Sequence, residues 1–127
     1  MAEASKQAAP FVPVADASAL DELFARSQDA PVLLFKHSTT CPISAHAYRE
    51  MSRLDVGPAR HVYLVVVQTA RPLSNEIAAR TGVRHESPQA IVLSRGEAAY
   101  TASHYDITAA EVERAVRENV PRARPNE

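Results

Sequence analysis

The chain contains a single cysteine, Cys41, and its surroundings constrain both the fold and the chemistry. The apolar run from Val32 to Phe35, typical of a buried strand, lies shortly before it, and Pro42 follows it directly. Proline suits the first position of a helix, because its missing N–H has no intrahelical partner there and its fixed φ matches the helix. The sequence therefore predicts a strand, a polar loop and a helix that begins at Cys41. One thiol also excludes an intramolecular disulfide, so no structural disulfide can hold the fold.

Composition predicts one globular domain. The 127 residues are 46% hydrophobic, and their composition does not change in the middle of the chain. A domain of this size is expected to bury roughly 65% of the surface of its extended chain. We assign residues 1–14 to a loose N-terminal lead-in, residues 15–120 to the domain and residues 121–127 to a polar C-terminal tail.

The charge and the start of the chain argue against two classes of partner. Fourteen basic and fifteen acidic residues give a formal net charge of -1, and no basic stripe stands out, so we expect no nucleic acid and no membrane surface. The first residues lack the basic and apolar regions of a signal peptide, and no apolar run approaches the ~20 residues of a transmembrane helix. These features predict a cytoplasmic protein, and one unpaired cysteine is compatible with a reducing compartment.

Hydrophobic periodicity alternates along the chain between helix and strand. Helical spacing predicts helices at residues 18–27, with Ser18 as the cap, and at 42–55, 72–81 and 108–119. Runs of β-branched and aromatic residues predict strands at 32–36, 61–68, 89–94 and 97–103, the last two joined by a turn. This order joins a βαβ unit to a ββα unit. It predicts an α/β, thioredoxin-like fold: a mixed four-stranded sheet flanked by helices, with an additional N-terminal helix.

Cys41 is expected to be a reactive thiol. At the start of a helix its sulfur would face unpaired backbone N–H groups at the positive end of the helix dipole, which favour the thiolate that attacks disulfides. Thr39, Thr40 and Ser44 are expected to stabilise this thiolate through their hydroxyl or backbone groups, at a helix start fixed by Pro42. Ser44 stands where a dithiol oxidoreductase has its second cysteine, so a redox cycle must take its second sulfur from another molecule. The alternative is a buried apolar thiol of the kind common in protein cores.

Four separated segments carry a resemblance to a known family. They are residues 35–44, which include Thr-Cys-Pro-Ile-Ser, residues 71–75, residues 85–89, and residues 103–104 with 107–108. In this order they resemble the YtxJ-type monothiol bacilliredoxins, over about residues 18–119. The resemblance implies a thioredoxin-like fold and an enzyme that removes bacillithiol from proteins carrying it as a mixed disulfide. It also implies that Cys41 is the nucleophile and that the bond between Ser87 and Pro88 is the cis-proline loop facing it.

The same resemblance implies the partners. Bacillithiol would be a co-substrate, S-bacillithiolated proteins the substrates, and a separate flavin-dependent bacillithiol disulfide reductase the enzyme that recycles the product; no tightly bound cofactor is expected. Cys41 would take bacillithiol from the modified protein, and a second bacillithiol would then release it. The residues expected to bind substrate are Ser87, Pro88 and His85, with Lys36 and Arg71 as partners for the malate carboxylates of bacillithiol.

Other interpretations of these residues stay open. Lys36 and Arg71 are also explained as solvated loop charges. His37 would either steer the thiolate, bind a metal with Cys41, or simply end a strand with its side chain towards solvent or a carbonyl. We predict no metal site, because no second thiol and no pair of histidines at helical separation lie near Cys41 in the sequence.

Two other classes of function also fit a monothiol thioredoxin fold. One is an iron–sulfur carrier, in which one cysteine per subunit and a low-molecular-weight thiol hold a 2Fe–2S cluster across a dimer. Such carriers usually have glycine where this chain has Pro42. The other is a redox-inert interaction module. Visible absorbance of the purified protein distinguishes the first of these from a bacilliredoxin, and the alkylation rate of Cys41 distinguishes the second.

Overall fold

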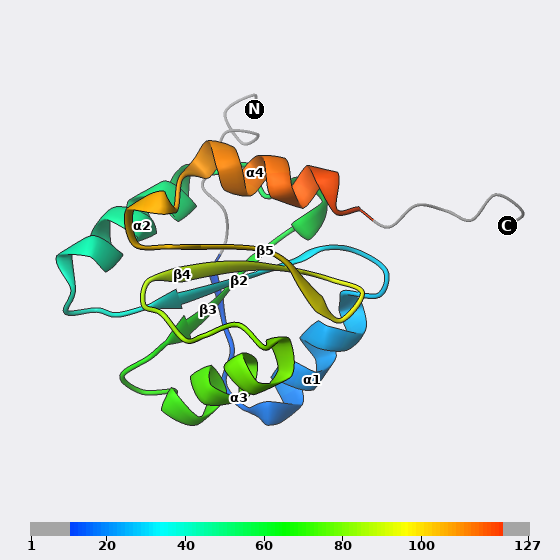
Figure 1. The fold of residues 1–127 in the computed structure, drawn as a ribbon, viewed down its shortest axis with the longest axis horizontal. Coiled ribbons are helices and arrows are strands. Elements are labelled where there is room, and N and C mark those ends of the chain that lie inside the picture. Colours follow the sequence, from blue (N-terminus) through cyan, green and yellow to red (C-terminus); the bar gives the residue numbers. More distant parts are fainter. Residues whose placement is uncertain (1–10, 121–127) are drawn as a thin grey trace, which may run out of the picture.

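The computed structural model describes residues 11–120, which form a mixed sheet between two layers of helices (Figure 1). In this part of the chain the elements are β1 (Phe11–Pro13), α1 (Ala17–Arg26), β2 (Val32–His37), α2 (Pro42–Arg53), the 3-10 helix η2 (Gly57–Ala59), β3 (Val62–Val66), α3 (Arg71–Thr81), β4 (Gln89–Ser94), β5 (Glu97–Ser103), the 3-10 helix η3 (His104–Asp106) and α4 (Ala109–Glu118). No helix among residues 11–120 has both the length and the apolar character needed to cross a membrane.

The sheet of the described residues has five strands in the order β1-β3-β2-β4-β5. β1 and β2 run parallel to β3, while β4 is antiparallel to both β2 and β5. The predicted four-stranded sheet is therefore wrong by one strand, because residues 11–13 pair with β3 instead of belonging to a loose lead-in. A three-residue strand has no measurable period, and Pro13 suits it because an edge strand tolerates a missing N–H. The rest of the predicted lead-in and the predicted tail at 121–127 lie outside the described residues.

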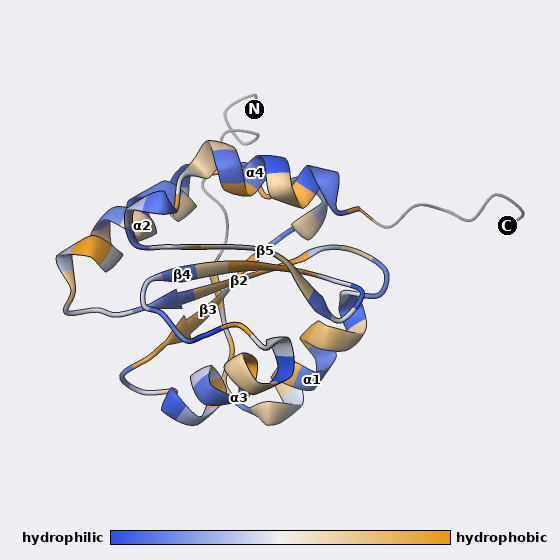
Figure 2. Cartoon of the chain, in the orientation of Figure 1, coloured by the Kyte–Doolittle hydropathy of each residue, from blue (hydrophilic) through white to orange (hydrophobic). Residues whose placement is uncertain are grey.

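Two apolar clusters fill the space on either side of the sheet. Successive residues of β2 point to opposite faces, so Leu33 and Phe35 pack towards α2 and α4, while Val32 and Leu34 pack towards α1 and α3. Figure 1 shows these two helix pairs on opposite faces of the sheet. All six residues of β2 are buried, as expected for a central strand covered on both faces. In Figure 2 the middle of the sheet is hydrophobic, whereas the end of β2 is hydrophilic.

Most element boundaries agree with the predictions from the sequence. α2 begins at Pro42 with Cys41 as its N-cap, and α3 is followed by Gly82 in the left-handed conformation, with φ 73°. Thr108 caps α4 by accepting a hydrogen bond from the backbone N–H of Glu111 at 3.3 Å. The predicted strands at 89–94 and 97–103 match β4 and β5, and the predicted strand at 61–68 is shortened to Val62–Val66.

The start of α1 differs from the prediction. The carboxylate of Asp16 accepts a hydrogen bond from the backbone N–H of Ala19 at 2.9 Å, so Asp16 is the N-cap. Ser18, the predicted cap, lies inside the helix. Both residue types cap helices well, and the chain uses the earlier one.

Candidate active site

Cys41 lies at the junction between β2 and α2, with a partly exposed side chain. Its backbone is extended, with φ −103° and ψ 125°, and its carbonyl accepts a hydrogen bond from the backbone N–H of Ala45 at 3.1 Å. As N-cap, its side chain occupies the place from which a serine or aspartate would bond the N–H groups of the first turn. The sulfur makes no such capping bond. This free thiol therefore lies beside the positive end of the dipole of α2.

A glutamine that the sequence analysis missed holds the loop before the cysteine. Gln68, in the turn that follows β3, accepts a hydrogen bond from the backbone N–H of Thr39 at 3.3 Å. Its amide donates to the hydroxyls of Ser38 at 2.9 Å and Thr40 at 3.2 Å. Because β2 and β3 are parallel, the residues that follow them meet at the same end of the sheet. That rule, applied to the predicted strand at 61–68, is the sequence signal that points to Gln68.

Two of the residues predicted to stabilise the thiolate, Ser44 and Thr40, take part in hydrogen bonds within the loop. Ser44 is fully buried, and its hydroxyl accepts a hydrogen bond from the backbone N–H of Ser38 at 3.2 Å. The hydroxyl of Thr40 lies 3.4 Å from that of Ser38 and accepts the Gln68 amide. Among the described residues these hydroxyls shape the loop and make no hydrogen bond to the sulfur. Pro42 occupies the first position of α2, as predicted, and fixes where the helix begins.

The bond between Ser87 and Pro88 is cis, as the family resemblance implies. Pro88 is buried, and its carbonyl accepts a hydrogen bond from the backbone N–H of His104 at 3.1 Å. In the ladder between β2 and β4, Lys36 pairs with Gln89. The cis-proline loop therefore precedes β4 at the same end of the sheet where β2 leads to the cysteine. Among the described residues the buried hydroxyl of Ser87 has no hydrogen-bond partner.

Lys36 lies in the interior and is not a loop charge. Its side chain is fully buried, and the ammonium donates to the carbonyl of Ser74 at 3.2 Å and lies 3.2 Å from Nδ1 of His85. Burial lowers the pKa of Lys36 to about 8. The expectation of a solvated charge is therefore wrong, and direct contact with a ligand carboxylate is closed to this ammonium. Lys36 is buried because α3, together with the segment before β4, covers this face of β2.

His85 stands over this buried charge and is itself exposed. Its Nδ1 lies 2.9 Å from the hydroxyl of Ser74 as well as 3.2 Å from the Lys36 ammonium. Desolvation of the part of the ring that faces the interior is the largest cause that lowers the pKa of His85; the charges of Lys36 and Arg71 lower it further, and Glu86 opposes them. Arg71 is exposed in the first turn of α3. The structure thus brings Lys36 and His85 into contact, while Arg71 lies one turn before Ser74 on α3.

His37 faces the core below the cysteine loop and not the solvent. Its side chain is only 9% exposed, and its ring lies 5.0 Å from that of Tyr48 and 5.6 Å from that of Phe35. Burial lowers its pKa, and its Nδ1 has no hydrogen-bond partner among the described residues. A shallow groove of about 310 Å³ lies next to His37. It is lined by His37, Ser38, Thr39, Ala45, Tyr48 and Arg49.

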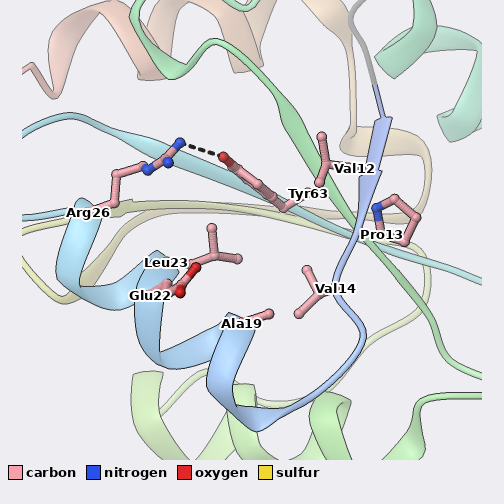
Figure 3. A pocket seen from close by; sticks show the side chains of 8 residues that line it. All are labelled: Val12, Pro13, Val14, Ala19, Glu22, Leu23, Arg26 and Tyr63. Carbon is pink, nitrogen blue, oxygen red and sulfur yellow. Dashed lines mark hydrogen bonds between the residues drawn. The ribbon is translucent and has the colours of Figure 1, made fainter.

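Two further features of the described residues bear on function. No three side chains of His, Cys, Asp or Glu within residues 11–120 come together as a metal site. A hollow of about 240 Å³ opens between β1 and α1, where Arg26 donates to the hydroxyl of Tyr63 at 2.7 Å (Figure 3). Its lining does not include Cys41. The thiol, the cysteine loop and the cis-proline loop therefore define the candidate active site.

The sheet order, the thiol at the start of α2 and the neighbouring cis-proline loop define a thioredoxin-like protein, and solved structures agree. A thioredoxin from Malassezia sympodialis has a TM-score of 0.65 at 14% identity, over 91% of this chain and 95% of its own. A thioredoxin variant from Halobacterium salinarum has a TM-score of 0.68 at 15% identity, over 91% and 95%. At such low identities these two similarities establish the fold alone.

More specific matches establish the family. The family model described as "Monothiol bacilliredoxin BrxC" matches residues 13–112, and this chain belongs to that family. A solved structure described as a candidate oxidoreductase with a thioredoxin fold is 32% identical, with a TM-score of 0.75 over 83% of this chain and 92% of its own. Family and fold together make the chain a thioredoxin-like protein with a thiol redox function.

Proposed function

We propose that this protein removes bacillithiol from S-bacillithiolated proteins through a mixed disulfide between Cys41 and bacillithiol. The observation that carries this proposal is the single, partly exposed thiol at the start of α2, in a chain with no second cysteine to resolve it. A monothiol of this kind completes a cycle only with an external thiol. Membership of the monothiol bacilliredoxin family supports bacillithiol as that thiol.

The proposed cycle consists of two thiol–disulfide exchanges. In the first, the Cys41 thiolate attacks the bacillithiol sulfur of the modified protein. The bond between that sulfur and the target cysteine breaks, a bond to Cys41 forms, and the target leaves as a thiolate that takes up a proton. In the second, the thiolate of free bacillithiol attacks the adduct, which releases the Cys41 thiolate and bacillithiol disulfide. Each exchange conserves electrons, so this chain needs no tightly bound cofactor.

Other components complete the proposal. A separate flavin-dependent bacillithiol disulfide reductase would reduce the product. The reducing cytoplasm is the compartment we propose for the cycle, because there Cys41 stays a thiol between turnovers.

We assign substrate binding to the residues that surround the thiol. Arg71 and His85 are exposed and would contact the malate carboxylates of bacillithiol, because an arginine fork and an N–H donor both suit carboxylate oxygens. The backbone of Ser87 would contact an extended segment of the substrate next to Pro88. Lys36 would act from the interior, through His85.

Mass spectrometry tests the proposal. Reduced protein incubated with a bacillithiolated target should gain one bacillithiol, located on Cys41, while the target regains its free thiol. Free bacillithiol should then remove the adduct. The Cys41→Ala variant should gain nothing, because no other residue performs the exchange. The proposal is overturned if no bacillithiol is transferred by protein whose Cys41 reacts readily with iodoacetamide.

A further inference from the structure

The buried ammonium of Lys36 lacks an anionic partner. Its side chain is fully buried, yet no carboxylate of the described residues forms an ion pair with it. Burying an unpaired charge is costly, so its hydrogen bonds have to hold it in place. The ammonium has two such partners, the carbonyl of Ser74 and Nδ1 of His85, each at 3.2 Å.

These contacts determine which nitrogen of His85 carries the proton. An ammonium group can only donate hydrogen bonds, so Nδ1 of His85 has to accept. The hydroxyl of Ser74, 2.9 Å from the same nitrogen, must then donate as well. The proton of the neutral ring therefore resides on Nε2, on the side of the ring away from Nδ1 and the buried charge. Two independent donors point to the same tautomer.

The location of His85 allows its Nε2–H group to contact a ligand. The residue is exposed and stands two positions before Ser87, the first residue of the cis peptide. The charge of Arg71 reaches it from the first turn of α3. The Nε2–H group therefore lies near the cis-proline loop, and Arg71 is exposed one turn before Ser74 on α3, the helix that contacts His85. Both side chains are donors to carboxylate oxygens.

We propose that Lys36 is a positioning residue that, together with Ser74, holds His85 in the neutral Nε2–H tautomer so that His85 donates a hydrogen bond to a carboxylate of bacillithiol. The identity of the ligand rests on the proposed function, whereas the tautomer does not. Burial and the charges of Lys36 and Arg71 lower the pKa of His85, and Glu86 acts in the opposite direction. The donor therefore stays neutral around pH 7, and its contribution to carboxylate binding does not change with pH there.

Nuclear magnetic resonance of the imidazole nitrogens tests the tautomer without any substrate. Long-range ¹H–¹⁵N spectra of the reduced wild-type protein should show a protonated Nε2 and an unprotonated Nδ1 for His85. In Lys36→Met the ring should titrate at least half a pH unit higher, because the neighbouring charge is gone. Arg84→Met is the matched control: it removes an exposed positive charge from the same segment and should leave the titration of His85 unchanged. A wild-type His85 protonated on Nδ1 overturns the proposal, and this result needs no variant to fold.

Kinetics test the second half of the proposal. The KM for free bacillithiol in release of the Cys41 adduct should be flat between pH 6.5 and pH 8 in the wild type. In Lys36→Met the fall in KM with decreasing pH should begin at least half a pH unit higher than in the wild type, because the Lys36 charge no longer opposes protonation of His85. A purely structural role for Lys36 predicts a KM change that is the same at every pH, and that outcome overturns carboxylate binding by His85. If adduct formation fails while the expected tautomer is present, the proposed function is wrong and the tautomer stands.

Discussion

Lys36 carries a positive charge into the interior of the domain, and this burial has a measurable effect on stability. Its pKa falls from 10.5 to about 8 in the folded protein because of burial. Between these two pH values the unfolded chain binds more protons than the folded one, so stability rises with pH across this window. Below pH 8 the burial of the charged ammonium destabilises the folded protein to its full extent. The pKa difference corresponds to about 3 kcal/mol.

Replacing Lys36 by Met should therefore change the pH dependence of the free energy of unfolding. Relative to Lys36→Met, the free energy of unfolding of the wild type should rise by up to about 3 kcal/mol as the pH rises from 8 to 10.5. The comparison isolates Lys36, because the contributions of the other titrating groups cancel between the two proteins. Urea unfolding of both proteins at several pH values measures this difference. Arg84→Met should show no such trend, since its side chain is exposed. If the difference in the free energy of unfolding between Lys36→Met and the wild type is the same at every pH, the ammonium is not desolvated.

Gln68 acts at the same scale, through the three hydrogen bonds that it makes to the loop before the cysteine. Each is solvent-exposed, so we expect Gln68→Ala to destabilise the protein by only about 1 kcal/mol. The amide hydrogen of Thr39, which loses its acceptor, should exchange faster with solvent. Transfer of bacillithiol to Cys41 should slow as the loop loosens. Gln28→Ala, at an exposed glutamine after α1, is the control and should change none of these quantities.

At the scale of single elements, the start of α1 offers a matched pair of variants. Asp16 accepts the hydrogen bond from the first turn, whereas Ser18 lies inside the helix. Asp16→Ala should cost about 1 kcal/mol of stability, the usual value of a lost N-cap. Ser18→Ala should stay within about 0.5 kcal/mol of the wild type. Thermal or urea unfolding measures both, and a larger loss for Ser18→Ala would contradict the cap assignment.

The elements also show why sequence alone predicted some parts of the fold and not others. The hairpin of β4 and β5 matched its prediction because local signals, β-branched runs and the turn at Arg95 and Gly96, specify both strands. β1 was missed because its evidence is not local: Phe11 and Pro13 become a strand by pairing with β3. The cap of α1 was misplaced because two good capping residues lie two positions apart, and only the backbone geometry selects one.

At the scale of the whole molecule, the mixed sheet gathers the site from separate parts of the chain. The parallel pair β2 and β3 brings Gln68 to the loop before Cys41, and the antiparallel pair β2 and β4 brings the cis-proline loop to the same end. Cys41 and Pro42 were predictable, since both their chemistry and their helix position are local. The burial of Lys36 was not, because α3 and His85, which are distant in sequence, determine it.

The proposed function requires that the single thiol prefers bacillithiol over other low-molecular-weight thiols. The most direct measurement compares the rate at which Cys41 takes the modification from one target protein carrying either bacillithiol or glutathione. We predict that bacillithiol is transferred roughly tenfold faster, since a charge-assisted hydrogen bond positioned for a malate carboxylate contributes about 1.4 kcal/mol or more, and the carboxylates of glutathione are placed differently relative to its sulfur. Arg71→Met should reduce this ratio. Equal rates, or faster transfer of glutathione, would contradict the claim and make the protein a glutaredoxin-like enzyme.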